Sequence, residues 1–258
     1  MNHVVSTLAV GLFAALLAAG GVVLWHHYRP AGEGGEEEGG DVVEYLSMMI
    51  ALLYALLLGL ALVSVWELRG DAGSNTSTEA GALHQMTMLA DGMPPAQQKR
   101  IEIMAERYAV HVVQDEWPRL EAQQPLGEQG WVLLRQLRAV SEAPPDATPA
   151  QEVTALEMLG QLSVLDEARR GRESAAGDSL SPLLWAGLAV GAVLSFCIVF
   201  FYGVGRTWSH LVMLMGMVGL TVFLAVLIHH LATPFGDVMG VAPDPFTEYF
   251  PRAATAGA

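Results

Sequence analysis

The sequence predicts an all-α membrane protein with four transmembrane helices, arranged two and two, and a helical cytoplasmic domain inserted between spans two and three. Two pairs of uncharged apolar runs bracket a long polar stretch. Hydrophobic residues make up 52% of the chain and charged residues only 16%, which is a low share for a soluble domain. This layout is typical of a multi-pass protein that lies in a lipid bilayer.

Each apolar run is long enough to cross the bilayer as a helix. A helix rises about 1.5 Å per residue, so about twenty residues cross the roughly 30 Å hydrocarbon core. The runs lack Asp, Glu, Lys and Arg and cover residues 4–25, 45–66, 182–202 and 209–231. The first run could instead be a cleaved signal peptide. A signal peptide begins with a positively charged region, however, and Met1-Asn2-His3 contains neither Lys nor Arg. We expect it to be retained as the first span.

The runs divide the chain into four parts. Residues 4–66 hold spans one and two with an acidic outer loop at 26–44, and residues 67–180 form the cytoplasmic helical domain. Residues 181–231 hold spans three and four, and residues 232–258 form a C-terminal cytoplasmic tail.

Arginines near the span ends predict the orientation in the membrane. The side that carries the termini and the central domain has more of them than the other side, which has only Arg29 and Arg206. Basic residues favour the cytoplasmic side, so we expect cytoplasmic termini and a cytoplasmic domain at the inner membrane of a bacterium. The arginines on that side are Arg69, Arg169, Arg170, Arg172 and Arg252.

The acidic charge of the chain argues against one class of partner. The net charge is −14, and acids outnumber bases in both the central domain and the outer loop. Nucleic-acid binding needs a basic face, so we expect no nucleic-acid partner. The outer loop includes the run 33–41, rich in Glu and Gly, which could concentrate cations at an outer mouth or serve as a solvated flexible linker.

Helix start and stop signals divide the central domain. The segment 76–79 matches a capping box and predicts a helix that ends near Gly92, and Pro95 can begin the next helix. The apolar face of that second helix has helical spacing and comprises Ile101, Met104, Ala105, Tyr108 and Val112. Pro118 predicts an end or a kink just after Trp117. A third helix is expected at 128–140, and a second capping box at 148–151 predicts the start of a fourth.

Part of this domain resembles a known family. The segment Asp115-Glu116-Trp117-Pro118 resembles a motif of the bestrophin-like family of bacterial four-span membrane proteins. Other similar pieces stand in the family's order over roughly residues 42–246. They are Glu79-Ala80 with Gly92-Met93-Pro94, Asp166 with Arg169, Arg170 and Arg172, Pro182–Trp185, and Pro234-Phe235.

The resemblance implies a ring-shaped oligomer around an ion pore, built from two spans, a helical cytosolic domain and two further spans. Two features of the family's pattern differ here. An acid often precedes the Pro-Phe pair, where this chain has Ala232-Thr233, and the dense acidic calcium clasp of bestrophins is not reproduced. Roles that rest on those carboxylates are therefore not expected in this chain.

By the same analogy, span two lines the pore. One face of this span offers two hydroxyls in an otherwise apolar lining, and a hydrophobic constriction of this kind can gate by wetting and dewetting. The alternative is that its polar side chains bond to neighbouring helices. The face comprises Ser47, Ala51, Tyr54, Leu58, Ala61 and Val65.

Charged residues of the family motif predict an ion-pair network. Asp115 and Glu116 are expected to pair, across antiparallel helices, with Arg169, Arg170 or Arg172. The alternative is that the acids line an ion-binding vestibule. In span three, Gly187 and Gly191 have a small-xxx-small spacing that permits close helix approach, either within the protomer or between subunits.

No metal, cofactor or enzyme signature stands out. His26 and His27 follow span one and His210 begins span four, so these three could meet at the outer surface, but interfacial histidines without a ligand are commoner. The chain has a single cysteine, and the P-loop, the Gly-x-Ser-x-Gly and the His-Glu-x-x-His patterns are missing. We expect no cofactor and no enzyme activity.

These observations favour a bestrophin-like oligomeric ion channel with span two lining the pore. The alternative is a non-conducting membrane scaffold or accessory subunit, whose cytoplasmic helical domain would bind a protein partner. A transporter is a third hypothesis, but the four spans show no clear inverted repeat. The expected partners are the lipid bilayer and further copies of the same chain.

Overall fold

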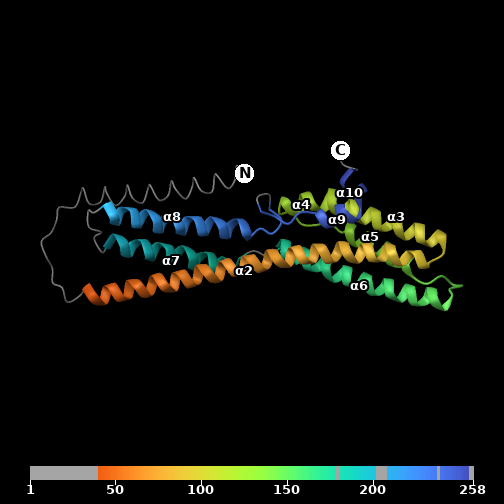
Figure 1. The fold of residues 1–258 in the computed structure, drawn as a ribbon, viewed down its shortest axis with the longest axis horizontal. Helices are drawn as coiled ribbons and strands as arrows, with labels where there is room; N and C mark the ends of the chain where they lie inside the picture. Colours follow the sequence, from red (N-terminus) through yellow and green to blue (C-terminus); the bar gives the residue numbers. More distant parts are fainter. Residues whose placement is uncertain (1–39, 178–179, 202–207, 237–238, 256–258) are drawn as a thin grey trace. The chain divides into compact units, whose positions relative to one another are not determined.

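The computed structural model describes residues 40–177, 180–201, 208–236 and 239–255, and within these ranges every element is a helix (Figure 1). The all-α class is therefore confirmed for this part of the chain. The first predicted span, with His26 and His27, lies outside the described residues.

The chain divides into two compact units. The apolar unit comprises residues 1–66 and 180–232, and the polar unit comprises residues 67–179 and 233–258. The cuts fall within a residue of the predicted ends of spans two and four and of the central domain. The C-terminal segment, however, belongs to the polar unit.

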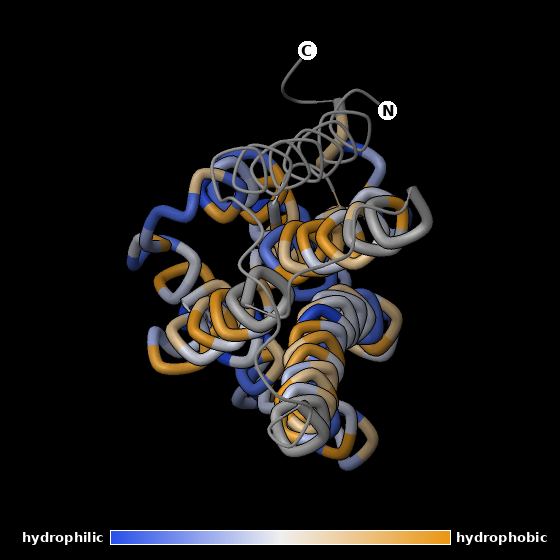
Figure 2. Tube along the Cα trace, turned by 90° about the vertical axis from the view of Figure 1, so that its left-hand side faces the viewer, coloured by the Kyte–Doolittle hydropathy of each residue, from blue (hydrophilic) through white to orange (hydrophobic). Residues whose placement is uncertain are grey.

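The apolar unit contains the first part of α2 (Gly40–Leu89) together with α7 (Pro182–Phe201) and α8 (Trp208–Leu231). Large hydrophobic residues of these helices occur at both buried and exposed positions and are not confined to one stripe. Figure 2 colours the Cα trace by the hydropathy of each residue. A helix that is hydrophobic all round is typical of a membrane span or of the core of a large protein. The buried hydrophobic cluster of this unit includes Tyr54, Leu58, Ala61, Val65, Leu188, Ile228, Leu231 and Ala232.

One helical segment among the described residues, Tyr45–Gly92, is long and apolar enough to cross a membrane. Met215–Leu231 forms a shorter apolar stretch. The count of four spans stays a prediction.

The polar unit packs the remaining helices around a second core. The second part of α2 leads through a 3-10 turn, η1 (Ala90–Gly92), into α3 (Pro95–His111). The π-helical turn η2 (Val112–Glu116) and α4 (Trp117–Glu121) continue the same helical run. The other elements are α5 (Gln129–Ser141), α6 (Pro149–Gly177), α9 (Asp244–Tyr249) and α10 (Pro251–Thr255).

Most helix boundaries of the polar unit follow the local sequence signals. Helix α3 begins at Pro95, and α5 lies within one residue of its predicted bounds at both ends. The second capping box is confirmed, because the Thr148 amide donates to Gln151 Oε1 and the Gln151 amide donates to Thr148 Oγ1. On the predicted apolar face of α3, all residues but Met104 are fully buried.

One local prediction in the polar unit is wrong. The first capping box does not begin a helix, because α2 runs through it and the Thr76 hydroxyl donates to the carbonyl of Ala72 inside the helix. Of the two alternatives at Pro118, an end and a kink, the end is excluded because the helix continues to Glu121. The break in α-helical geometry precedes Pro118, where the Trp117 amide donates to the carbonyl of Val112, five residues back.

The described part of the C-terminal segment is folded into the polar unit instead of forming a free tail. Phe235, Phe246 and Phe250 are buried in its core. The ring of Tyr249 stacks on His84 with 4.5 Å between centroids. Burial of these rings ties the segment to α2 and α3.

Candidate functional site

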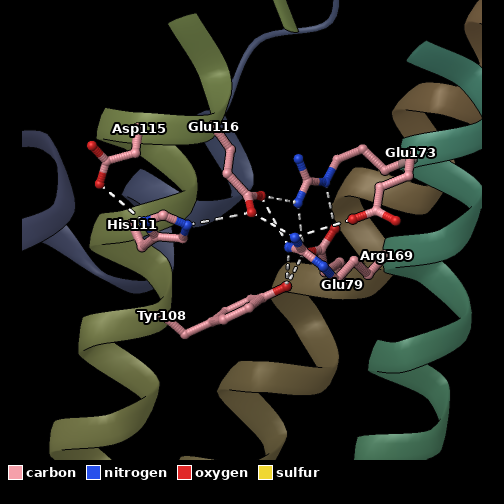
Figure 3. Close-up of polar contacts among 8 residues, drawn as sticks. Glu79, Tyr108, His111, Asp115, Glu116, Arg169 and Glu173 are labelled. Carbon is pink, nitrogen blue, oxygen red and sulfur yellow. Dashed lines mark hydrogen bonds and ion pairs between the residues drawn. The ribbon is translucent and has the colours of Figure 1, made fainter. Parts of the chain in front are cut away.

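Five side chains from four elements form a buried polar cluster in the polar unit (Figure 3). Helix α2 supplies Glu79, α3 supplies Tyr108, η2 supplies Glu116, and α6 supplies Arg169 and Arg172. All five are solvent-inaccessible or within 1% of it. Ionisable groups are rarely buried so completely unless they are paired.

Each carboxylate of the cluster accepts hydrogen bonds from a guanidinium through both of its oxygens. Arg169 donates from Nη2 to Glu116 Oε1 at 2.5 Å and from Nη1 to Glu116 Oε2 at 3.0 Å. Arg172 donates from Nε to Glu79 Oε2 at 2.6 Å and from Nη2 to Glu79 Oε1 at 3.0 Å. A further bond from Arg172 Nη2 to Glu116 Oε2, at 2.7 Å, joins the two pairs.

Tyr108 closes the cluster on the side of α3. Its hydroxyl donates to Glu79 Oε1 at 2.5 Å and accepts from Arg169 Nη1 at 3.0 Å. At the edge of the cluster the half-buried carboxylate of Glu173 lies 3.1 Å from Arg169 Nη2, so three carboxylates contact the two guanidiniums. The cluster joins α2, α3, η2 and α6 through buried hydrogen bonds.

The protonation states agree with this geometry. Burial raises the pKa of Tyr108 well above its usual value, so its hydroxyl keeps the proton it donates. Burial alone would raise the pKa of Glu116, but hydrogen bonds from His111 and Arg169 and the charge of Arg172 lower it overall. Glu116 is therefore ionised at neutral pH.

His111 connects the buried cluster to the surface. Its Nε2 lies 3.5 Å from Glu116 Oε1, and its Nδ1 lies 2.9 Å from Asp115 Oδ2. The hydrogen bond with Glu116 raises the pKa of His111, burial opposes this, and Asp115 adds to the rise. The imidazole thus spans an exposed carboxylate and a buried one (Figure 3).

The π-helical turn explains how the motif directs adjacent acids to opposite environments. A bond from residue i to i−5 widens the turn relative to an α-helix. Glu116 reaches the buried arginines, whereas Asp115 is 62% exposed on its side chain. Turns of this kind are frequent at functional sites.

Gly130, in the first turn of α5, lets that helix approach the cluster. A methyl group at this position would overlap Arg169 Nη2 and Glu116 Oε1. Both groups are fixed by their mutual hydrogen bonds, so neither can move away at low cost. A residue without a side chain is therefore required here.

Trp117 links the cluster to the C-terminal segment. Its ring meets Phe235 edge-on with 5.6 Å between centroids, and the Arg172 guanidinium lies 5.9 Å from the same ring. The carbonyl of the preceding residue, Pro234, accepts a hydrogen bond from the amide of Val241. The Pro-Phe pair thus belongs to the same packed region as the Glu-Trp part of the motif.

The remaining charged residues of the predicted network lie at the surface. Asp166 pairs with Arg138 at 3.2 Å. Arg170 is exposed and lies 5.8 Å from the Trp131 ring. Pro118 is exposed at the start of α4. The network therefore uses Glu116 from the motif, and Asp115 contacts His111 instead of an arginine.

The face of α2 that was predicted to line a pore is packed inside the chain. Tyr54, Leu58, Ala61 and Val65 lie in the core of the apolar unit, where Leu188 and Ile228 belong to the same cluster. The opposite side of α2 is exposed. Burial within one chain therefore favours the opposite side for a pore, and the predicted face stays a prediction. Ser47 is half-buried and Ala51 is exposed.

The small residues of α7 allow α2 to pack closely against α7 within the protomer. A methyl group on Gly191 would overlap the Tyr54 ring, and one on Gly187 would lie 3.6 Å from Leu57 Cδ2. Of the two alternatives for this spacing, close approach within one protomer is the one that the structure shows.

Two of the three histidines considered for a metal site, His26 and His27, lie outside the described residues. His210 lies in the first turn of α8, and its side chain is not described. Within the described residues, no group of three or more His, Cys, Asp or Glu side chains is placed to hold a metal ion.

Sequence reasoning missed the roles of Glu79 and Tyr108. Glu79 was assigned to a helix cap, and Tyr108 to an apolar face. The polar ends of both side chains meet Arg169 or Arg172, more than fifty residues away in the chain. A buried helix face that carries Tyr and a mid-helix Glu is the signal that could have found them.

A model of the bestrophin-like domain matches residues 12–246. The chain belongs to the bestrophin-like family. Arg169, Arg172, the Glu-Trp pair and the Pro-Phe pair lie within the matched range. None of the curated proteins compared with this chain matches it.

Solved structures share the fold over nearly the whole chain. A bacterial bestrophin homologue from Klebsiella pneumoniae with a point mutation has a TM-score of 0.69 at 14% identity, covering 97% of this chain and 98% of that chain. A second point mutant of that homologue has a TM-score of 0.67 at 14% identity, covering 96% of each chain. A protein described only as a membrane protein has a TM-score of 0.69 at 12% identity, covering 97% and 96%. At these identities the likeness shows the fold alone.

Proposed function

We propose that the protein is a subunit of a homo-oligomeric ion channel in a bacterial inner membrane. The observation that carries the proposal is the family match across residues 12–246, because bestrophins are ion channels. The fold shared with bestrophin homologues over nearly the full chain supports it. In this proposal the chain has four spans, its termini and polar unit are cytoplasmic, and it conducts ions without acting as an enzyme.

Within this channel, α2 lines the pore through its exposed face. Leu56 is 60% exposed, whereas Leu58, two residues later, is 7% exposed. Leu52 and Val63 share the exposed side with Leu56. These side chains would form an apolar constriction, which controls conduction by wetting and dewetting. Oligomerisation would remove part of this surface from lipid.

An exposed apolar pair on α6 fits contact with a second subunit. Val153 is 64% exposed and Leu156 is 69% exposed, on a helix of the polar unit. Large apolar side chains that lie together on an exposed surface often mark a site of interaction with another protein. The same pair supports the second candidate function, a non-conducting scaffold that binds a different protein there.

In the proposed channel, the buried cluster has a mechanical role. Its Glu79 and Glu116 carboxylates are inaccessible, so they cannot bind a permeating ion. Its hydrogen bonds hold α2 to α3 and α6.

Cysteine accessibility tests the pore assignment. In a Cys197→Ser background, Leu56→Cys and Leu58→Cys proteins are reconstituted into liposomes, and ion flux is measured before and after a charged thiol reagent. We expect the reagent to change flux through the Leu56→Cys protein and to leave the Leu58→Cys protein unaffected. The opposite pattern would mean that the buried face of α2, and not the exposed one, lines the pore. Co-purification of a stoichiometric partner, with no symmetric oligomer, would favour the scaffold.

A further inference from the structure

The outward side of α3 is basic around one apolar residue. Ile101 and Tyr108 are buried on the core side of this helix, and Ile103 lies on the opposite side with 39% of its surface exposed. At the edge of this outward side, Glu106 is paired with Arg252 at 3.1 Å. The other charged residues within one turn of Ile103 on this side are basic. We call this surface the basic face, which comprises Lys99, Arg100, Ile103 and Arg107.

The outward side of α6 is acidic around several apolar residues. It lies opposite Met158 and Leu162, which are buried in the core of the polar unit. Between Pro149 and Ala168 this helix has four acidic residues and neither lysine nor arginine. All the outward residues are exposed. We call this surface the acidic face, which comprises Val153, Leu156, Glu157, Val164 and Glu167.

The two faces of one chain cannot meet each other. Helix α2 lies between α3 and α6 (Figure 1, Figure 3), and each face points away from the core. Lys99 and Arg107 on one face, and Glu157 and Glu167 on the other, form no ion pair with another residue of the described part of the chain. Each face therefore needs a second molecule to supply the opposite charge, and a second copy of this chain carries it.

The faces also match along the length of the helices. A Cβ at Gly92 would lie 3.3 Å from Thr154 Oγ1, and Arg169 donates to the Tyr108 hydroxyl, 61 residues earlier. Helices α3 and α6 thus run in the same direction, and residues about sixty positions apart lie at the same level. By this offset Arg107 lies at the level of Glu167 and Ile103 at the level of Val164. Lys99 lies within about one helical turn of the level of Glu157.

We propose that the basic face of one subunit packs against the acidic face of the next, in a head-to-tail ring. The inference rests on the proposed homo-oligomer and names its contact in the polar unit. Rotation about a ring axis that runs along these helices keeps every residue at its own level, so it brings Arg107 to Glu167 and Ile103 to Val164. Two different surfaces that complement each other close into a ring and not into a two-fold dimer.

Cysteine pairs test this contact in the full-length protein. In the Cys197→Ser background, Ile103→Cys and Val164→Cys are made singly and together, and the proteins are oxidised in liposomes and separated on a non-reducing gel. We expect the double variant to form a ladder of covalent multimers that ends at the complete ring, and each single variant to remain monomeric on the gel. The control combines Ile103→Cys with Arg135→Cys, at an exposed residue of α5 outside both faces, and should give no ladder.

Charge reversal tests the pairing of the two faces. Arg107→Glu and Glu167→Arg each place like charges at every contact of the ring, so each should weaken the oligomer about tenfold or more. The double variant exchanges the two charges and should recover most of this loss. Dissociation is measured by dilution of the purified protein in one detergent, followed by mass photometry. Glu121→Arg, at an exposed acid of α4 outside both faces, is the control and should leave the oligomer unchanged.

Three results would overturn the proposal. Covalent dimers of the Ile103→Cys protein alone would show a two-fold contact. An intact oligomer without a ladder in the double-cysteine protein would place the interface elsewhere. Losses that add in the double charge reversal would exclude the pairing of Arg107 with Glu167.

The same samples separate this proposal from the channel function. A ladder in liposomes that conduct no ions would contradict the channel and leave the contact standing. Conducting, oligomeric protein without a ladder would contradict the contact and leave the channel standing.

Discussion

Glu116 and Arg169 form a two-pronged ion pair in which both side chains are within 1% of complete burial. The neighbouring residue, Asp115, has a side chain that is 62% exposed. Two adjacent acids of one motif therefore differ strongly in solvent exposure. The difference makes them a matched pair for experiment.

Replacing Glu116 should destabilise the protein strongly. Glu116→Gln removes the buried carboxylate that Arg169 and Arg172 share and leaves Arg169 paired with Glu173, and breaking a buried pair costs about 3–5 kcal/mol of unfolding free energy. Asp115→Asn should cost less than about 1 kcal/mol, because the carboxylate faces solvent. Thermal unfolding followed by tryptophan fluorescence measures both. Equal losses of Tm would show that burial does not distinguish the two acids.

Gly130 should not tolerate a methyl group. Gly130→Ala places an atom against Arg169 Nη2 and Glu116 Oε1, and overpacking a fixed core typically costs about 1–3 kcal/mol. At Gly160, inside α6, an added Cβ would have no atom within 4 Å, so Gly160→Ala should gain up to about 1 kcal/mol from helix propensity. The two unfolding temperatures should move in opposite directions. A stabilised Gly130→Ala protein would contradict the close approach of α5.

The stabilising effect of His111 should depend on pH. The pKa of His111 is raised above its ordinary value of 6.5 by the hydrogen bond to Glu116, against the opposing effect of burial, with a further rise from Asp115. A raised pKa in the folded state stabilises the protein fully below the unfolded value and loses this effect as pH rises through the folded value. The difference in Tm between the wild-type and His111→Gln proteins should therefore be largest below about pH 6.5 and shrink at higher pH.

Asp115→Asn provides the control for this titration. It removes one of the two carboxylates that contact His111 and should reduce, but not abolish, the pH dependence. A wild-type advantage over His111→Gln that grows from about pH 6 to about pH 9 would have the wrong sign for a protonated imidazole.

The C-terminal segment should contribute to the stability of the polar unit. Phe235→Ala removes a buried ring that meets Trp117 edge-on, and such truncations cost about 3–5 kcal/mol. Met239, in the same segment, is exposed, so Met239→Ala should change stability by less than about 0.5 kcal/mol. A Phe235→Ala protein as stable as the Met239→Ala protein would show that the segment is not part of the core.

Sequence patterns predicted those features that depend on neighbouring residues. Helical spacing identified the buried face of α3, and the reciprocal bonds of Thr148 and Gln151 depend on residues three apart. The same capping pattern failed at Thr76, because α2 continues through it and Glu79 is held by Arg172 from α6. Local rules cannot register a partner ninety-three residues away.

The predicted pore face shows the same limit of local rules. Small and hydroxyl-bearing residues on one helical face suit both a pore and close helix packing. On α2 the choice is made by α7, where Gly191 leaves room for the Tyr54 ring. A helical-wheel projection of α2 alone does not show which neighbouring helix each face contacts. In the sequence, nothing distinguishes the leucines on the opposite face of α2 from other residues of a membrane span.

Ion flux through liposomes that contain the purified protein is the most direct test of the proposed channel. The account predicts flux above that of protein-free liposomes, altered by a charged thiol reagent at Leu56→Cys and unaltered by the same reagent at Leu58→Cys. Folded, oligomeric protein that leaves the liposomes as tight as protein-free ones, before and after the reagent, would contradict it.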